Sequence, residues 1–116
     1  MNAKELKKAL GEGRRVYGTM ISSPAPRWVE YLRSVSLDFV FIDTEHIPLD
    51  RSQVSWMCQA FSAAGIAPIV RIPSPSPYEA CMSLDAGASG IVAPYLETVE
   101  QVQALLRWAH ANHVGI

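Results

Sequence analysis

Apolar residues recur along this chain in two alternating patterns. Short apolar runs that are typical of buried strands occur at residues 16–21, 39–42, 66–71 and 91–93. Apolar residues at helical spacing follow Pro26, Asp50, Ser76 and Thr98. Strands that alternate with helices at this interval predict an α/β protein with a parallel sheet built from four strand–helix units.

Four such units form either a small open sheet or half of an eight-unit barrel, because a full barrel needs roughly 250 residues. The last residues add no closing element, and a half barrel has edge strands that must be paired or covered. We therefore expect residues 1–116 to be a single partial (β/α)8-barrel domain, about the first four of eight units, from the N-terminal portion of a larger protein. The alternative is that two such halves associate.

Polar residues at fixed spacing mark where the helices begin. The pairs that resemble capping boxes or related N-terminal caps are Asn2 with Glu5, Asp50 with Gln53, Ser76 with Glu79, and Thr98 with Gln101. The stripes expected to share a helix face are Leu6 and Leu10, then Trp28, Leu32 and Val35, then Val54, Met57, Cys58 and Phe61, and last Val102, Leu105, Leu106 and Ala109. The third stripe is predicted to pack in the core, and Gly65 is predicted to end its helix.

Composition narrows the class of protein. The chain is 49% hydrophobic with a net charge of −1, which allows a packed core and provides no basic stripe for nucleic acid. No apolar run approaches the roughly 18 residues of a membrane span, and the N-terminus lacks the apolar region of a signal peptide. We expect a cytoplasmic protein. Cys58 and Cys81 lack metal-site spacing and are predicted to be buried structural thiols.

The stretch after the second strand carries the chemistry. Asp43, Glu45 and His46 directly follow the apolar run 39–42, and parallel strands of α/β proteins place their sites at these C-terminal ends. Two carboxylates and an imidazole are the parts of a proton-transfer site. His46 is interpreted as a base near neutral pH, and the alternative is an exposed loop histidine.

Other charged residues have a functional and a structural interpretation. Arg71 ends the third strand, where its planar fork suits a carboxylate or an enolate oxygen; the alternative is an ion pair with Asp43 or Glu45. An acid such as Asp85 near a helix C-terminus is disfavoured by the helix dipole, which suggests a functional role; the alternative is that it is simply a poor residue at a helix end. His110 and His113 lie one turn apart without a third ligand and are expected to be ordinary helix-end residues.

Four segments together resemble one family of enzymes. They are GTMISSPAPRWVEYL, DFVFIDTEHIPLD, APIVRIP and LDAGASGIVAPYLETVEQV, in this order along the chain. In these segments the Glu-His pair, the Val-Arg strand end and the Leu-Asp-x-Gly turn are similar to the metal-dependent pyruvate aldolases of the HpcH/HpaI family, which are related to the citrate lyase β subunit. The resemblance covers nearly the whole chain from about Gly18.

The resemblance implies a (β/α)8 barrel that cleaves or forms a carbon–carbon bond between pyruvate and an aldehyde. It assigns His46 as the base and Arg71 as the residue that binds substrate and stabilises enolate charge. It assigns Asp85 as an acid that raises the basicity of the histidine, either within one chain or from a neighbouring subunit. Asp43 and Glu45 match acids that shape the same mouth. The implied partners are a keto acid, an aldehyde and further copies of the chain.

The resemblance also implies a divalent metal ion, Mg²⁺, Mn²⁺ or Co²⁺, that is chelated by the keto acid. Its two carboxylate ligands are expected on strands five and six, so no metal ligand is predicted within this segment. Glu97 and Glu100 follow the fourth strand, but they are expected to be ordinary acids at a helix N-terminus. The isolated chain is therefore predicted to be inactive in aldol cleavage.

Two other functions remain open at this point. One keeps the barrel but acts on a related enolate in a citrate-lyase-like or citrate-forming reaction. The other is a noncatalytic module that binds small anions or mediates oligomerisation.

Overall fold

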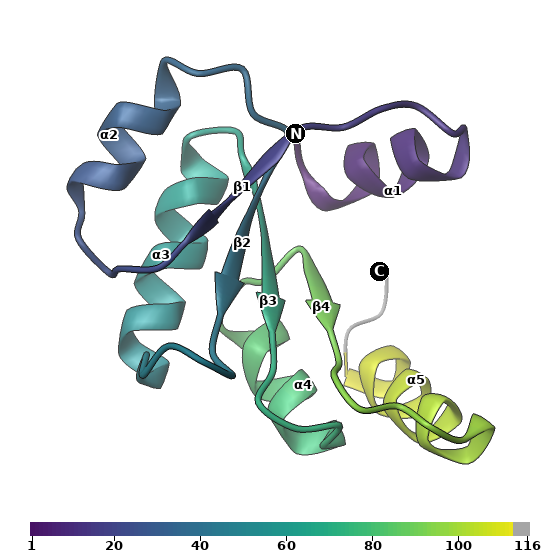
Figure 1. Ribbon diagram of the computed structural model, residues 1–116. Coiled ribbons are helices and arrows are strands. Elements are labelled where there is room, and N and C mark those ends of the chain that lie inside the picture. The colour runs from purple at the N-terminus through teal and green to yellow at the C-terminus, as the bar shows by residue number, and fades with distance from the viewer. Residues whose placement is uncertain (113–116) are drawn as a thin grey trace.

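The computed structural model describes the backbone of residues 1–112 and the side chains of residues 1–109. Its elements are α1 (Ala3–Gly11), β1 (Gly18–Ile21), α2 (Arg27–Arg33), β2 (Phe39–Asp43), α3 (Arg51–Ala63), β3 (Ala67–Arg71), α4 (Pro77–Asp85), β4 (Gly90–Val92) and α5 (Val99–Asn112). After α1, each strand is followed by a helix (Figure 1). The four predicted strand–helix units are thereby confirmed, with boundaries that differ by one or two residues.

The strands form one parallel sheet in the order β1-β2-β3-β4. The register aligns Met20 with Phe41 and Phe41 with Ile69, and it aligns Asp43 with Arg71. Consecutive strands are neighbours and each crossover contains a helix, which is the pattern of an α/β barrel wall. The prediction of parallel (β/α) units is confirmed.

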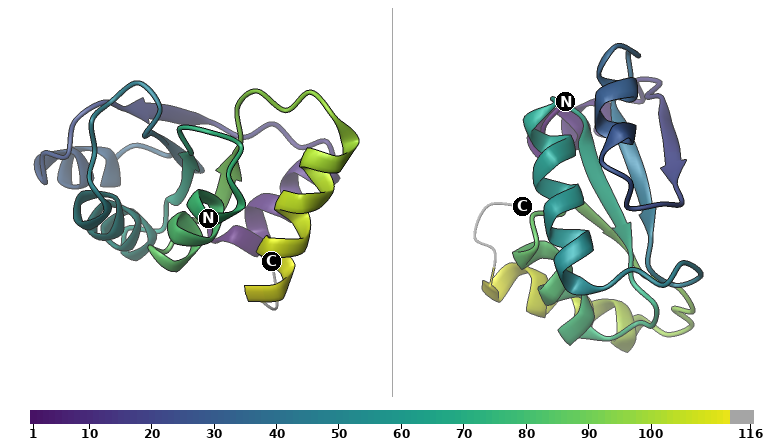
Figure 2. Two further views of the ribbon diagram at one scale, coloured as in Figure 1. Left: turned by 90° about the horizontal axis from the view of Figure 1, so that it is seen from below. Right: turned by 90° about the vertical axis from the view of Figure 1, so that its left-hand side faces the viewer.

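The two faces of the sheet have different surroundings. Val40, Ile42 and Val70 are fully buried on the face that α3 and α4 cover (Figure 2). The opposite face carries Phe41 and Asp43, because strand side chains alternate between faces. Met20 on this second face is 54% exposed. We call this side of the sheet, which carries Met20, Phe41 and Asp43, the open face.

The core lies between the sheet and α3. Val54, Met57, Cys58 and Phe61 are all buried, so the predicted stripe is confirmed. Burial raises the pKa of the Cys58 thiol to about 12, which fits an unreactive structural cysteine. Cys81 is only half-buried, and the expectation that it is buried is wrong.

The helix ends follow the predicted capping pattern. Capping boxes are present at α1, with Asn2 and Glu5, and at α3, with Asp50 and Gln53. Gly65 follows α3 with a φ of 79°, a left-handed conformation that glycine adopts without a Cβ clash. It allows the chain to reverse into β3.

Several amphipathic faces are less buried than their spacing suggested. Leu10 is 56% exposed and Ala9 is buried instead. Trp28 on α2 and Val35, just after that helix, are exposed, while Val29 on α2 contacts the core. On α5, Leu106 is 51% exposed. Helical spacing indicates which residues share a face, but it does not indicate what covers that face.

None of the helices in the described part of the chain combines the length and the apolar character needed to cross a membrane.

Replacing Phe61 with alanine is expected to lower the free energy of unfolding by about 3 to 5 kcal/mol. Phe61 is 1% exposed, so its removal leaves a cavity under the sheet. Urea denaturation followed by circular dichroism measures the loss, and Gln59→Ala on the exposed side of α3 is the matched control. Equal denaturation midpoints in both variants would contradict this assignment of the core.

Candidate functional site

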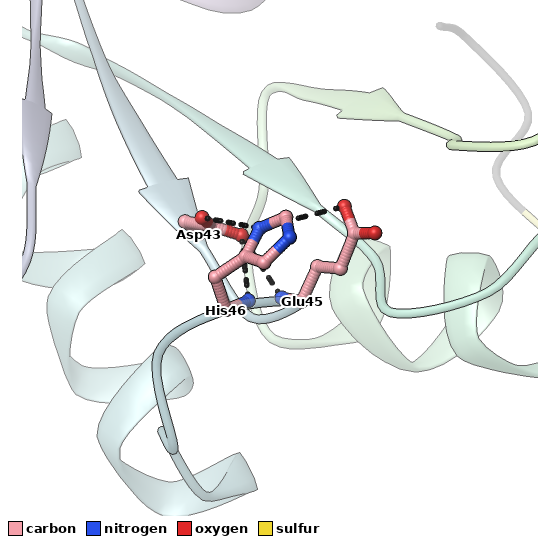
Figure 3. A group of neighbouring side chains, drawn as sticks. All are labelled: Asp43, Glu45 and His46. Carbon is pink, nitrogen blue, oxygen red and sulfur yellow. Dashed lines mark hydrogen bonds and ion pairs between the residues drawn. The ribbon is translucent and has the colours of Figure 1, made fainter.

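Asp43 is the last residue of β2 and organises the turn that follows. Its Oδ1 accepts hydrogen bonds from the backbone N–H groups of Glu45 at 2.9 Å and His46 at 3.3 Å. These local bonds hold the Glu45 and His46 side chains beside Asp43 at the C-terminal end of the strand (Figure 3). The predicted grouping of the three residues is therefore present in the structure.

Arg71 completes the group from the neighbouring strand. Its Nε donates to Asp43 Oδ1 at 3.0 Å and its Nη2 to Oδ2 at 2.5 Å, which is a bidentate pair. The two strand ends are also tied by Thr44, whose backbone N–H and hydroxyl both donate to the Arg71 carbonyl. The guanidinium lies 5.5 Å from the centre of the Phe41 ring, which supports the arginine from the open face.

The pair has strong electrostatic consequences. Hydrogen bonding to Arg71 holds the pKa of Asp43 well below its usual range, against the opposing effect of burial. The same bond raises the pKa of Arg71. Asp43 is therefore a carboxylate and Arg71 a cation throughout the physiological range. Arg71 does form an ion pair with Asp43, which was the alternative interpretation of this residue from the sequence. This pair leaves other N–H groups of the arginine available.

Glu45 is the second acid of the group. Its Oε2 lies 3.2 Å from Arg71 Nε, and its side chain is only 9% exposed. Its Oε1 accepts a hydrogen bond from the Tyr95 hydroxyl in the loop after β4. Bonding to Glu45 raises the pKa of Tyr95. Sequence reasoning missed Tyr95, which lies shortly after the C-terminal end of β4 and has no glycine to signal its left-handed backbone.

The tautomer of His46 follows from its partners. Arg71 Nη2 lies 2.8 Å from His46 Nδ1, and a guanidinium nitrogen can only donate. Nδ1 must therefore accept, so the proton of the neutral ring is on Nε2. Asp43 Oδ2 lies 3.3 Å from the same Nδ1 and would accept from it only if Arg71 withdrew. The His46 side chain is 62% exposed, so the ring faces solvent at the mouth of the site.

Asp43, Glu45 and His46 offer the ligand types of a cation site, but their surroundings do not fit a divalent ion. The ligand atoms of Asp43, Glu45 and His46 lie within 4.8 Å of one another. However, the Arg71 guanidinium contacts Asp43, Glu45 and His46 Nδ1. A metal ion in this position would stand beside a permanent positive charge. The group is an acid cluster neutralised by arginine and is not suited to hold a divalent ion.

The structure does not bring Asp85 into this group within one chain. Asp85 ends α4, which runs from the C-terminal end of β3 back to the start of β4. It is exposed at the opposite end of the sheet from His46. Its predicted role beside the histidine stays a prediction that requires a subunit contact.

Other predicted residues lie apart from the site as well. Glu100 is in the first turn of α5, as expected of an acid at a helix N-terminus. Glu97 precedes that turn, and its backbone N–H donates to Gln101. The His110 side chain and His113 lie outside the described residues.

A separate hollow of about 270 Å³ lies on the helix side of the same loops. Its lining residues are Thr44, Leu49, Arg51, Val54, Pro73, Tyr78, Glu79, Met82, Ser83 and Ala86. Thr44 borders it, but Asp43, Glu45, His46 and Arg71 do not line it. The charged group therefore lies on the open face of the sheet and not in this hollow.

Replacing Asp43 with asparagine is expected to remove an acid-sensitive part of the stability. Because the folded pKa of Asp43 is depressed, its contribution is fully present above its ordinary pKa of 3.8 and is lost as the pH falls below that value. Urea denaturation at pH 7 and at pH 2.5 measures this: the deficit of Asp43→Asn relative to the unaltered chain should shrink at the lower pH. Glu12→Gln, at an exposed acid paired with Lys8, is the control. A deficit that is equal at both pH values would contradict the assignment.

A parallel sheet whose consecutive strands are neighbours, with a charged cluster at its C-terminal end, has the layout of part of an α/β barrel. Comparison with known proteins gives the family: the profile of the HpcH/HpaI aldolase/citrate lyase family matches residues 17–116. The chain belongs to this family, and the resemblance of its four sequence segments is confirmed.

Three relatives illustrate the match. A hydroxypyruvate/pyruvate aldolase of Roseobacter denitrificans is 34% identical over 101 residues, which is 87% of this chain and 40% of the relative. The crystal structure of an HpcH/HpaI aldolase from Desulfitobacterium hafniense superposes with a TM-score of 0.81 at 30% identity, over 90% of this chain and 40% of that one. The citrate synthase SbnG gives the same TM-score at 35% identity, over 90% and 42%. The chain thus spans about two fifths of the length of these relatives.

Proposed function

We propose that this chain carries the enolate-forming half of the active site of a pyruvate aldolase, a carbon–carbon lyase that reversibly splits a 4-hydroxy-2-oxo acid into pyruvate and an aldehyde. The observation that carries the proposal is the bidentate Arg71–Asp43 pair with His46 beside it, at the C-terminal ends of β2 and β3. A cationic fork next to an imidazole is suited to hold an enolate and to move its proton. The aldolase names among its relatives support the same reaction.

Arg71 would bind the carboxylate or enolate oxygen of the keto acid. Its contacts with described residues use Nε and Nη2, so both N–H groups of Nη1 are free for a ligand. Asp43 fixes the plane of the fork, which reduces the entropy lost when the substrate binds. The arginine is thus oriented before the substrate arrives.

His46 would act as the base once the substrate accepts the Nη2 N–H that Arg71 now donates to Nδ1, while the other Nη2 N–H stays on Asp43 Oδ2. Nδ1 then loses its donor, and a proton on Nδ1 can be directed to Asp43 Oδ2, which is 3.3 Å away. This tautomer leaves the Nε2 lone pair facing the mouth, where it can take a proton from the substrate. The Asp43 carboxylate, which remains ionised, stabilises the imidazolium that forms.

The remaining parts of the site are assigned outside this group. Since Arg71 occupies the acid cluster, we place the divalent ion implied by the family on residues beyond the described part of the chain. Asp85 would reach His46 from a second subunit, which makes the active protein a homo-oligomer. The 116 residues would form one partial barrel domain within that assembly.

A graft tests the proposed function. Residues 17–116 would replace the matching segment of the Roseobacter denitrificans relative, which supplies the remaining barrel. Pyruvate release from 4-hydroxy-2-oxopentanoate, coupled to lactate dehydrogenase with Mn²⁺ present, measures the activity. We expect turnover by the graft and none by the 116-residue chain alone. A folded, oligomeric graft without turnover, beside an active parent, would overturn the proposal.

A citrate-forming reaction is the second candidate, favoured by the similarity to citrate synthase SbnG. It uses the same enolate chemistry with a different acceptor. Supplying the graft with oxaloacetate and an acetyl thioester and measuring citrate separates the two reactions. Citrate formation faster than pyruvate release would favour the second candidate.

A further inference from the structure

Tyr95 lies in the loop after β4 with an unusual backbone. Its φ is 56°, the only positive φ at a non-glycine residue in the described chain. This conformation is unfavourable for a residue with a Cβ, and it persists where the surroundings impose it. Such residues are frequent at functional sites, so the contacts of Tyr95 indicate what the strained turn achieves.

The side chain of Tyr95 links this loop to the end of β2. Its hydroxyl donates to Glu45 Oε1, fifty residues earlier in the chain. The Tyr95 residue is 67% exposed, while the Glu45 side chain is 9% exposed. A nearly buried carboxylate requires a donor for each oxygen. Glu45 Oε2 forms an ion pair with Arg71 Nε, whose single N–H is donated to Asp43 Oδ1, and Tyr95 donates a hydrogen bond to Oε1.

Glu45 is a potential competitor for the arginine that binds substrate. If Oε1 had no donor, the carboxylate could turn both oxygens toward Arg71 and make a bidentate pair, as Asp43 already does. Such a pair would use the N–H groups that the proposed function reserves for the keto acid. A donor on Oε1 prevents this.

We propose that Tyr95 is a positioning residue: its hydroxyl holds Glu45 in a one-oxygen contact with Arg71 and so keeps the Nη1 edge of the arginine open for the substrate carboxylate. The catalytic consequence rests on the proposed function. The contact itself does not, because it is a property of the folded chain. The residue acts through Glu45 and touches no reacting atom.

The contact is tested without any turnover. The 116-residue chain, labelled with ¹³C at the tyrosine ring carbon that bears the hydroxyl, would be titrated by NMR, and Tyr95→Phe identifies the resonance of Tyr95 among the four tyrosines. We expect Tyr95 to titrate above the ordinary value of about 10 and to return toward it in Glu45→Gln. Titration of Tyr95 at the same pH in the unaltered chain and in Glu45→Gln would overturn the proposal.

The consequence is tested in the graft. Tyr95→Phe should raise the KM for pyruvate in methyl exchange by about threefold to tenfold, the effect of one hydrogen bond to a charged group at an exposed position. Its kcat should change less than twofold, because the bound substrate already occupies Arg71. Tyr31→Phe, the same chemical change away from the site, should leave both constants unaltered.

A double variant separates positioning from general damage. In a Glu45→Gln background the neutral amide no longer competes for Arg71, so adding Tyr95→Phe should leave KM unchanged. An equal rise of KM in both backgrounds, or no rise in either, would overturn the proposal. If the parent graft shows no exchange at all, the proposed function fails, and the tyrosine titration still decides whether Tyr95 holds Glu45.

Discussion

Replacing Arg71 with glutamine is expected to lower the rate of deuterium exchange into the pyruvate methyl group by about 10²- to 10³-fold in the graft, the range seen when one donor to a developing oxyanion is removed. The substitution removes the cation that we propose to lie beside the enolate and the planar guanidinium that we propose to bind the carboxylate. Proton NMR of pyruvate in D₂O, with Mn²⁺ supplied and then removed before measurement, follows the loss of the methyl signal.

Loss of Arg71 also leaves Asp43 without its partner, so stability must be separated from chemistry. Arg71→Lys keeps the charge and should recover most of the urea midpoint, yet it cannot make the bidentate contact and should recover little of the exchange. Arg51→Gln, at an exposed arginine on α3, is the control for general loss of charge. Exchange rates within threefold of the unaltered graft in Arg71→Gln would refute the role of the arginine.

The second large effect is expected at His46. Replacing it with alanine should slow methyl exchange by about 10²- to 10⁴-fold, the usual contribution of a positioned general base. Because the side chain is 62% exposed, its removal should cost little stability, and the urea midpoint should stay near that of the unaltered protein. The same D₂O exchange assay measures the effect.

Free imidazole distinguishes a missing base from a distorted site. Added to His46→Ala, it should restore part of the exchange in proportion to its concentration, since a small base can enter the exposed mouth. It should have no such effect on Arg71→Gln. Full exchange in His46→Ala without imidazole would show that another group takes the proton.

Local sequence signals predicted the elements well because they depend on neighbouring residues. The capping box of Asp50 and Gln53 and the stripe from Val54 to Phe61 act within one or two helical turns, and both are present. Exposure was predicted less well. Trp28 shares a helix with buried Val29, and spacing alone could not tell which of them the sheet would cover.

The residues of the site also fall into those that the sequence predicted and those that it did not. Asp43, Glu45, His46 and Arg71 were predictable because strands of known direction bring their C-terminal ends together. Tyr95 was not, because its left-handed backbone has no glycine to signal it and its partner Glu45 lies fifty residues away. Asp85 lies at the opposite end of the sheet because α4 runs back toward the start of β4. The prediction from the sequence did not take this direction into account.

We infer that this chain supplies the groups that form and hold an enolate. Methyl deuterium exchange in the graft tests it most directly, because exchange needs proton removal but no aldehyde. We expect exchange at a rate near that of the parent aldolase, and we expect it to be lost in both His46→Ala and Arg71→Gln. Exchange that is unaffected by either substitution would contradict it, and so would a folded, oligomeric graft that does not exchange while its parent does.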